Sequence, residues 1–208
     1  ISTSGPGATN MITSICNCFY ESIPCIFLSG NINSKFMRPH DRIRQIGFQE
    51  TDLISIVESI TKYAVCIKDP KDIRYELEKS YFLSTSGRCG PIVLDIPMDI
   101  QKADVDVETL TGFDSSAFEL KYDFHAIEKK VVNFFEDLIK AKRPVILAGG
   151  GLRVTNNIEK FNKILEKLKI PTFVTWNGID VVTSDCDYYG GRVGTYGGPG
   201  RNFGIQNA

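Results

Sequence analysis

The feature that most constrains the fold is a repeated alternation of short apolar runs with amphipathic segments. Apolar runs bounded by proline or glycine lie at residues 26–28, 64–67 and 92–96, and their length is typical of buried strands. Residues 6–20, 51–60 and 73–81 carry apolar side chains at helical spacing. Strands separated by helices predict a parallel sheet with right-handed crossovers, so the fold class is α/β.

The alternation stops once and then resumes. Residues 102–121 lose the alternation, with Asp104, Asp106 and Glu108 supplying charge and Thr111-Gly112 and Ser115-Ser116 supplying flexibility, as in interdomain linkers. Helical faces follow at 127–138 and 158–168, with apolar strands at 144–148 and 171–174. We therefore predict two parallel-sheet α/β units, at residues 1–101 and 122–208, joined by a linker at 102–121. Ile1 reads as the end of a strand and Asn207 as part of a helix, so we expect both domains to be partial.

Composition and motif spacing exclude several classes of protein. The chain has 24 basic and 25 acidic residues, without the basic excess of a nucleic-acid binder. It has no apolar run of about 18 residues, which a membrane-spanning helix needs. Its six cysteines form no CxxC pair and its two histidines lie far from any such pair, so zinc spacing is absent. We expect structural, reduced cysteines and a cytoplasmic protein.

Three short motifs contain residues suited to ligand contact. Ser4-Gly5-Pro6-Gly7-Ala8-Thr9-Asn10 follows a strand and opens a helix, where free backbone N–H groups suit polar or anionic ligands. Phe48-Gln49-Glu50 precedes a helix, and Ser86-Gly87-Arg88-Cys89-Gly90-Pro91 joins a helix to a strand. Each motif alone has an ordinary interpretation: a tight turn, an acid at a helix start, and a helix stop with a surface arginine.

Taken together, these motifs resemble those of a known enzyme family. TSGPGATN, FQE, SITKYAV and LSTSGRCGPIVLDIPMDIQ occur in the order and spacing of acetolactate synthase (acetohydroxyacid synthase) large subunits, which are thiamine-diphosphate enzymes. RPVILAGGG is similar to the start of that family's central domain. The resemblance implies that residues 1–101 are the C-terminal part of the pyrimidine-binding domain and that residues 122–208 begin the central domain.

The resemblance assigns roles to the residues that match the family's motifs. It places one group beside the aminopyrimidine of thiamine diphosphate: Gly5, Pro6, Gly7 and Asn10. A second group would contact a flavin (FAD): Arg88, Gly149, Gly150, Gly151, Gly194 and Thr195. Phe48 and Gln49 would line the approach of substrate.

The resemblance also implies which parts of the catalytic machinery this chain does not contain. The family's catalytic glutamate lies upstream of TSGPGATN, and the Mg²⁺ ligands belong to a diphosphate-binding domain. We therefore expect no catalytic residue and no metal ligand here, and a chain that is inactive alone. The family's active sites lie between subunits, which implies a homodimer or homotetramer.

Several positions depart from the family pattern. Val193 stands where the family commonly has His, and Gly197-Gly198-Pro199-Gly200 is inserted after the Gly-Thr-Tyr segment, so flavin binding is left open. Met98 replaces the lysine that usually follows Pro97 near the substrate funnel. The loop before FQE is longer and more basic than usual, with Lys35, Arg38, His40, Arg42 and Arg44. This loop is either solvated, part of a subunit interface, or suited to a larger or more acidic substrate.

Three functional interpretations follow. The first is a thiamine-diphosphate-dependent transferase that decarboxylates one 2-keto acid and joins the product to another, as in branched-chain amino acid biosynthesis. The second keeps the cofactor but makes the protein a decarboxylase, oxidase or carboligase for a different, acidic or sugar-linked substrate. The third is a non-catalytic binding module.

Overall fold

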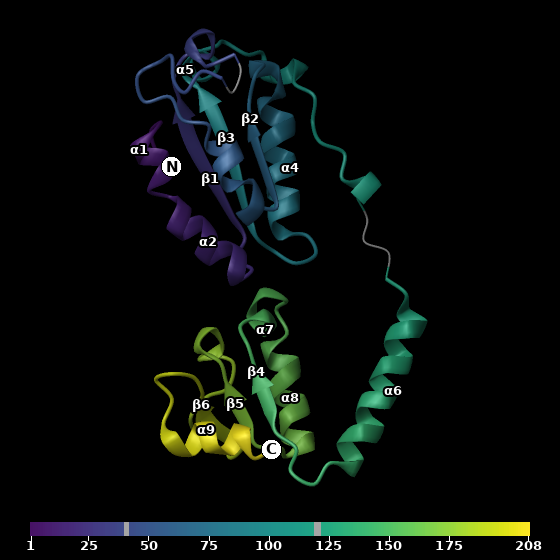
Figure 1. Cartoon of the computed structure of the whole chain (residues 1–208). Helices are drawn as coiled ribbons and strands as arrows, with labels where there is room; N and C mark the ends of the chain where they lie inside the picture. Colours follow the sequence, from purple (N-terminus) through teal and green to yellow (C-terminus); the bar gives the residue numbers. More distant parts are fainter. Residues whose placement is uncertain (40–41, 119–121) are drawn as a thin grey trace. The chain divides into compact units, whose positions relative to one another are not determined.

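The computed structural model describes residues 1–39, 42–118 and 122–208, and the chain divides into two compact units, Ile1–Leu120 and Lys121–Ala208. Each unit consists of one three-stranded parallel sheet with flanking helices, so the predicted α/β fold class is confirmed (Figure 1).

The first unit is built on a parallel sheet with the order β1-β3-β2. Its strands are β1 (Cys25–Asn31), β2 (Tyr63–Cys66) and β3 (Pro91–Pro97). β3 is the central strand and is buried along almost its whole length. Ser2 adds an isolated parallel bridge to Ser29 beside β1, as expected for the end of a strand.

Helices cover both faces of this sheet. They are α1 (Pro6–Thr9), α2 (Ile12–Tyr20), α3 (Leu53–Val57), α4 (Ile73–Thr85) and α5 (Met98–Gln101). One core cluster joins Ala8, Ile15, Leu53 and Val57 from the helices to Phe27 and Val93 of the sheet. The buried neighbours Ile92 and Leu94 alternate with Val93 along β3 and therefore point to the other face. Short 3₁₀ turns complete the unit at Ser34–Phe36, Glu58–Ile60, Pro70–Asp72, Val107–Thr109 and Ser116–Phe118.

Two sequence-based expectations for this unit need correction. The helix predicted at residues 6–20 is interrupted, since Asn10 is the C-cap of α1 and Met11 is the N-cap of α2. The helical segment predicted at residues 51–60 begins only at Leu53, because Asp52 caps α3 and its side chain accepts a hydrogen bond from the Ser55 N–H (3.2 Å). Asp is a preferred N-cap because its carboxylate satisfies an otherwise free helix N–H.

The segment predicted as a flexible linker packs partly on the first unit. The Phe113 ring lies 5.5 Å from the Tyr75 ring and 5.7 Å from the Phe82 ring of α4. The Phe113 N–H also donates to Glu78 (2.7 Å). Aromatic pairs of this kind contribute roughly 0.5–1.5 kcal/mol beyond area burial. The part of the segment around Phe113 is therefore held against α4.

The second unit repeats the α/β arrangement with the strand order β4-β5-β6, all parallel. Its strands are β4 (Ile146–Ala148), β5 (Thr172–Val174) and β6 (Tyr189–Arg192), and its helices are α6 (Phe124–Lys140), α7 (Gly151–Val154), α8 (Ile158–Leu168) and α9 (Pro199–Gln206). A 3₁₀ turn lies at Trp176–Gly178. Leu165 of α8 joins Ala148, Val174, Val181 and Val182 in the core cluster.

Candidate functional site

The turn Ser4–Thr9 and the Phe48–Gln49 pair meet in the first unit. Gly5 has φ +58°, and a Cβ at this position would lie 2.6 Å from the Gln49 carbonyl oxygen and 2.9 Å from its Cβ. Gln49 itself adopts the left-handed conformation, with φ 62°. Only glycine fits such a close approach without strain, so the contact explains why this turn needs Gly5.

These two segments enclose a shallow pocket of about 390 Å³. It is lined by Gly5, Pro6, Thr9, Gln45, Phe48, Gln49 and Thr51. Phe48 is 85% exposed, which is unusual for a large aromatic side chain and leaves its ring available for a flat ligand. The structure thus brings together four of the residues proposed from sequence: Gly5, Pro6, Phe48 and Gln49.

A second hollow of about 690 Å³ lies on the other side of Phe48 and Gln49. Its lining includes Ser4, Gly30 and Met98. Met98 is therefore a wall residue of the space next to Gln49, at the carboxyl ends of β1 and β3. Ligands of open α/β sheets commonly bind at this edge.

Gly7 and Asn10 belong to the same turn but do not line the pocket. A Cβ on Gly7 would lie 2.6 Å from the Thr3 Cγ2, so a side chain there would have to displace the Thr3 methyl group. Asn10 is exposed at the end of α1, where its N–H donates to the Pro6 carbonyl at 3.2 Å and the next N–H, of Met11, donates to the Ala8 carbonyl at 3.0 Å. Their predicted cofactor contacts remain predictions.

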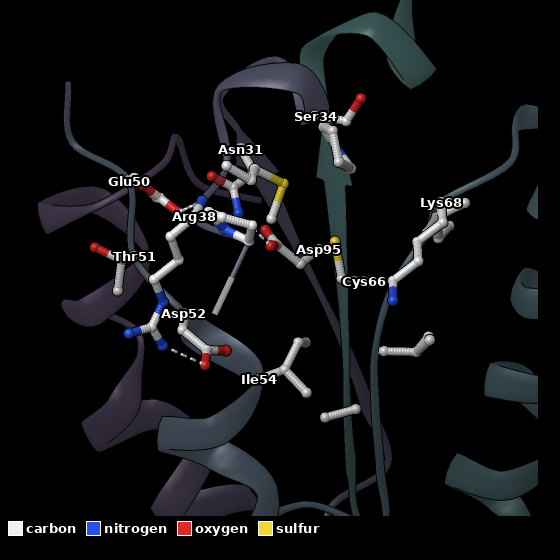
Figure 2. Close-up of a pocket in the computed structure, with 16 residues that line it drawn as sticks. Asn31, Ser34, Arg38, Glu50, Thr51, Asp52, Ile54, Cys66, Lys68 and Asp95 are labelled. Atoms are coloured by element: carbon white, nitrogen blue, oxygen red, sulfur yellow. Dashed lines mark hydrogen bonds and ion pairs between the residues drawn. The ribbon is translucent and has the colours of Figure 1, made fainter. Parts of the chain in front are cut away.

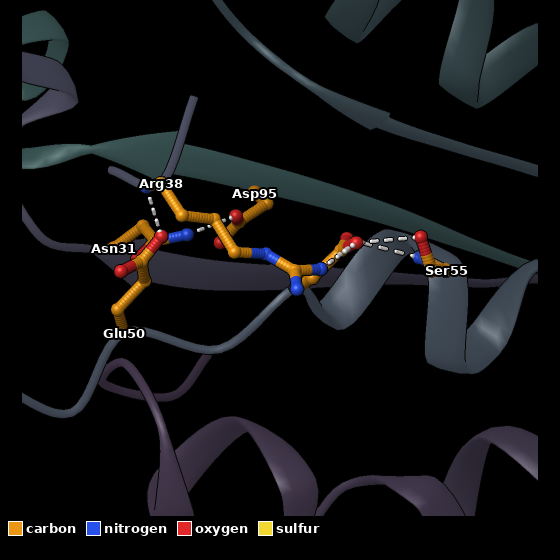
Figure 3. A network of polar contacts seen from close by, with 6 residues as sticks. Asn31, Arg38, Glu50, Ser55 and Asp95 are labelled. Carbon is orange, nitrogen blue, oxygen red and sulfur yellow. Dashed lines mark hydrogen bonds and ion pairs between the residues drawn. The ribbon is translucent and has the colours of Figure 1, made fainter. Parts of the chain in front are cut away.

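The basic loop is organised by two acidic residues that the sequence did not single out for this role. Glu50 is only 8% exposed, and its carboxylate accepts the N–H groups of Arg38 and Ile46. Burial opposes ionisation of Glu50, but these backbone donors outweigh it and lower its pKa. Asp52 pairs with the Arg38 guanidinium at 2.8 Å (Figure 2). Figure 3 shows the same network with Glu50 accepting the Arg38 N–H. Arg38 is therefore neutralised locally and is not an anion-binding cation of the loop.

The other basic residues of this loop are dispersed. Lys35 lies over the Phe36 ring at 4.9 Å, and Arg42 and Arg44 are exposed. His40 lies outside the described residues. A concentrated anion site is therefore not formed by the part of this loop that the structure describes.

Arg88 lies at the opposite end of the first sheet, where β3 begins. It sits between α4 and β3, at the amino end of the strand, and its Nε donates to the Ser22 Oγ at 2.8 Å. The structure does not bring it together with Gly5 and Gln49. Its guanidinium is exposed and could reach an anionic ligand running past this edge.

The glycine residues of the second unit gather at the carboxyl ends of its strands. Gly149, Gly150 and Gly151 follow β4, and Gly194 and Thr195 follow β6. A Cβ on Gly150 would lie 2.7 Å from the Asn177 carbonyl oxygen, whereas one on Gly151 or Gly194 would meet nothing within 4 Å. Gly194 has φ +125° and is held by Asn202, which accepts its N–H at 3.1 Å and donates to its carbonyl at 3.0 Å. Asn202 of α9 thus fixes the loop that contains Thr195.

An aromatic surface that the sequence did not reveal lies at the same edge. Trp176 follows β5 and is 62% exposed, and Tyr196 is 79% exposed with its ring 6.1 Å from the Trp176 ring. The Arg192 guanidinium lies 4.9 Å from the centre of the Trp176 ring, a favourable cation–π arrangement. Trp176 is the only tryptophan of the chain, and its position directly after a predicted strand was the one sequence feature that could have indicated this aromatic surface.

The described residues form neither a group of metal ligands nor a membrane-spanning helix. No group of three or more His, Cys, Asp or Glu side chains there could hold a metal ion. Within the same ranges, no helix is long and apolar enough to cross a membrane. The absence of such a group concerns only metal sites built from the described residues of this chain.

Comparisons with known proteins identify relatives for nearly the whole chain. Residues 1–56 match the family described as "Thiamine pyrophosphate enzyme, N-terminal TPP binding domain", and residues 132–208 match "Thiamine pyrophosphate enzyme, central domain". The acetolactate synthase isozyme 2 large subunit of Escherichia coli is 30% identical over 206 residues, which are 99% of this chain and 35% of that protein. The probable acetolactate synthase large subunit of Methanocaldococcus jannaschii is 32% identical over 99% of this chain and 34% of that protein. The acetolactate synthase large subunit of Buchnera aphidicola (from Acyrthosiphon pisum) is 33% identical over 99% of this chain and 35% of that protein. The chain therefore spans about a third of the length of the curated relatives that it matches.

Proposed function

Because the chain combines the N-terminal and central domains of the thiamine pyrophosphate enzymes and is homologous to acetolactate synthase large subunits, we propose that it forms part of an enzyme that decarboxylates a 2-keto acid and joins the product to a second keto acid. The enzyme is then a transferase. Bound thiamine diphosphate supplies the carbon nucleophile for this chemistry.

One observation of this structure carries the proposal: the close approach of Gly5 to Gln49 beside the exposed ring of Phe48. The pocket between them admits a flat heteroaromatic ring, and the absence of a side chain at Gly5 allows the two segments that flank it to touch. In the proposed enzyme, Gly5, Pro6 and Thr9 support the aminopyrimidine side of the cofactor. Phe48 and Gln49 separate this pocket from the hollow where substrate enters.

The chain builds one side of such a site. In the proposed enzyme, Mg²⁺ and the diphosphate are held outside this chain, and a second subunit completes the active site in a homodimer or homotetramer. FAD contacts are proposed at the strand ends of the second unit, at Gly149–Gly151 and Gly194–Thr195. In the first unit, Arg88 is proposed as a flavin contact by family resemblance alone. We further propose a cytoplasmic location. The chain alone is expected to turn over no keto acid.

A second candidate function is favoured by Met98. The lysine that the family usually carries after Pro97 would place a cation in the hollow beside Gln49, but here that wall is a half-exposed thioether. A thioether does not attract a carboxylate, so the enzyme could prefer an acceptor with an apolar body. The reaction would then be decarboxylation, oxidation or carboligation of a different substrate.

The test is a product analysis of the complete protein that carries this chain. Pyruvate, alone and paired with 2-keto acids that have larger apolar side chains, is supplied with thiamine diphosphate and Mg²⁺, with and without FAD, and the products are identified by mass spectrometry. Acetolactate supports the first function. Acetaldehyde, acetate or other condensation products from pyruvate support the second, and Met98→Lys should then raise the share of acetolactate. No turnover of any 2-keto acid contradicts both.

A further inference from the structure

A pair of cysteines lies where α2 turns into β1 in the first unit. Cys18 is near the end of α2, and Cys25 is the first residue of β1. Both side chains are partly buried and pack against the same core cluster, and both are reduced. The proposed function makes no use of them, since neither cysteine lines the two pockets at Gln49.

The turn between this helix and this strand is a Schellman motif, which brings the two cysteines together. The Ile23 N–H donates to the Cys18 carbonyl at 2.9 Å, and Ser22 has φ 56°, the left-handed conformation that the motif needs directly after the helix. Pro24 follows and prevents the helix from continuing. The chain therefore reverses within a few residues, and Cys25 returns to the level of Cys18.

The two thiol groups are in contact. The side chains of Cys18 and Cys25 are hydrogen-bonded to each other. A disulfide bond needs an S–S distance of about 2.0 Å, so the two sulfurs need only a small further approach while the helix and the strand stay in place. Burial, followed by the charge of Cys25, raises the pKa of the Cys18 thiol. Cys18 therefore stays protonated, and Cys25 is the sulfur that reacts first with an oxidant.

We propose that Cys18 and Cys25 form a modification site, a dithiol that hydrogen peroxide oxidises to an intramolecular disulfide. The Cys25 sulfur attacks one peroxide oxygen and the O–O bond breaks, so Cys25 becomes a sulfenic acid, and its proton leaves with the other oxygen as water. The Cys18 sulfur then attacks the Cys25 sulfur, the S–O bond breaks, and the Cys18 proton leaves with this oxygen as a second water. The two thiols lose two electrons and two protons, and one peroxide is reduced to two waters.

The disulfide closes the chain between Cys18 and Cys25 into a ring that contains Ser22. The Ser22 Oγ accepts the Arg88 Nε–H at 2.8 Å. Oxidation therefore modifies the turn that holds Arg88, at the end of the sheet away from Gly5. The inference does not depend on the thiamine diphosphate site, because neither cysteine lines the pocket at Gly5.

The test is oxidation of the complete protein with a small excess of hydrogen peroxide, followed by alkylation of the remaining thiols and digestion with a protease that cleaves after Glu. Cleavage after Glu21 separates Cys18 from Cys25, so only a disulfide keeps their two peptides together in mass spectrometry. We expect this linked pair of peptides, and its separation by dithiothreitol. Cys18→Ser and Cys25→Ser should abolish the linkage. Cys16→Ser should leave it, because two residues along an α-helix place Cys16 on nearly the opposite face of α2.

A second measurement on the unmodified protein keeps the proposal testable if the serine variants do not fold. Phenylarsine oxide condenses with two neighbouring thiols, forming two As–S bonds and releasing water. It should protect Cys18 and Cys25 together from iodoacetamide added after unfolding, whereas Cys16 should still be alkylated. Three results overturn the proposal: no linkage of the two peptides after peroxide, a linkage that Cys16→Ser removes, or alkylation of Cys18 and Cys25 that phenylarsine oxide leaves unchanged.

Discussion

The substitution Asp95→Asn tests whether the first unit tolerates a buried charge at a cost in stability. Burial raises the pKa of Asp95 from 3.8 to about 6. A group whose pKa is higher in the folded state stabilises the fold below its unfolded pKa, and that contribution is lost as the pH rises through the folded pKa. Asp95 therefore makes the protein less stable at pH 7.5 than at pH 4.5.

The magnitude follows from the two pKa values. At 1.36 kcal/mol per factor of ten in proton affinity, the interval from 3.8 to about 6 corresponds to about 3 kcal/mol. About 2 kcal/mol of this develops between pH 4.5 and 7.5. Asn cannot ionise, but its amide leaves an unpartnered N–H where Oδ1 was, which costs roughly 1–3 kcal/mol at both pH values. Asp95→Asn should thus be about 2 kcal/mol more favourable, relative to the unmodified protein, at pH 7.5 than at pH 4.5.

The assay is urea unfolding of both proteins at the two pH values, with hydrogen exchange of peptides that span β1 and β3 as the readout. These strands report the first unit alone. Other carboxylates titrate in both proteins, so their effect cancels in the difference. A difference that does not change with pH would refute the reasoning, because it would mean that Asp95 has its unfolded pKa in the folded state.

Three further predictions concern packing and surface contacts. Gly5→Ala should destabilise the first unit by about 2 kcal/mol or more in urea unfolding, because it places a Cβ against Gln49 on a backbone with positive φ. Gly200→Ala, whose Cβ would have no neighbour within 4 Å, should be nearly neutral. Equal effects of the two substitutions would contradict this explanation. Phe113→Ala should cost about 1–2 kcal/mol and should increase proteolysis within residues 102–118, whereas unchanged cleavage would show that the segment is not held by this ring. Arg153→Ala should cost less than about 1 kcal/mol and less still in high salt, because both side chains of its ion pair with Asp180 are about half exposed; a loss well above this value in thermal unfolding would contradict it.

Much of the fold could be predicted from periodicity, and the exceptions have physical causes. Apolar runs such as residues 92–96 and the i, i+4 pattern of α4 indicate their elements directly. β6 could not be predicted, because Gly190 and Gly191 are poor strand residues and the strand forms only through its pairing with β5. The break at Asn10 likewise has no breaker residue to mark it.

The candidate sites divide in the same way. The motifs that contain Gly5 and Gln49 could be identified from the sequence, but nothing in it indicated that these two residues touch. Asp95 is the single acidic residue in the apolar run IVLDIP, and this was the only indication in the sequence that its carboxylate is buried. Its hydrogen bonds with Asn31 and Cys66 depend on tertiary packing, and no local pattern specifies them.

The central claim is that the Gly5–Gln49 pocket receives thiamine diphosphate. Hydrogen exchange of the complete protein, with and without thiamine diphosphate and Mg²⁺, tests it most directly. We predict slower exchange in the peptides that contain Gly5 to Asn10 and Phe48 to Glu50, with the peptides of α8 unchanged. Exchange that is the same with and without the cofactor at Gly5 and Gln49, or protection confined to other parts of the protein, would contradict the account.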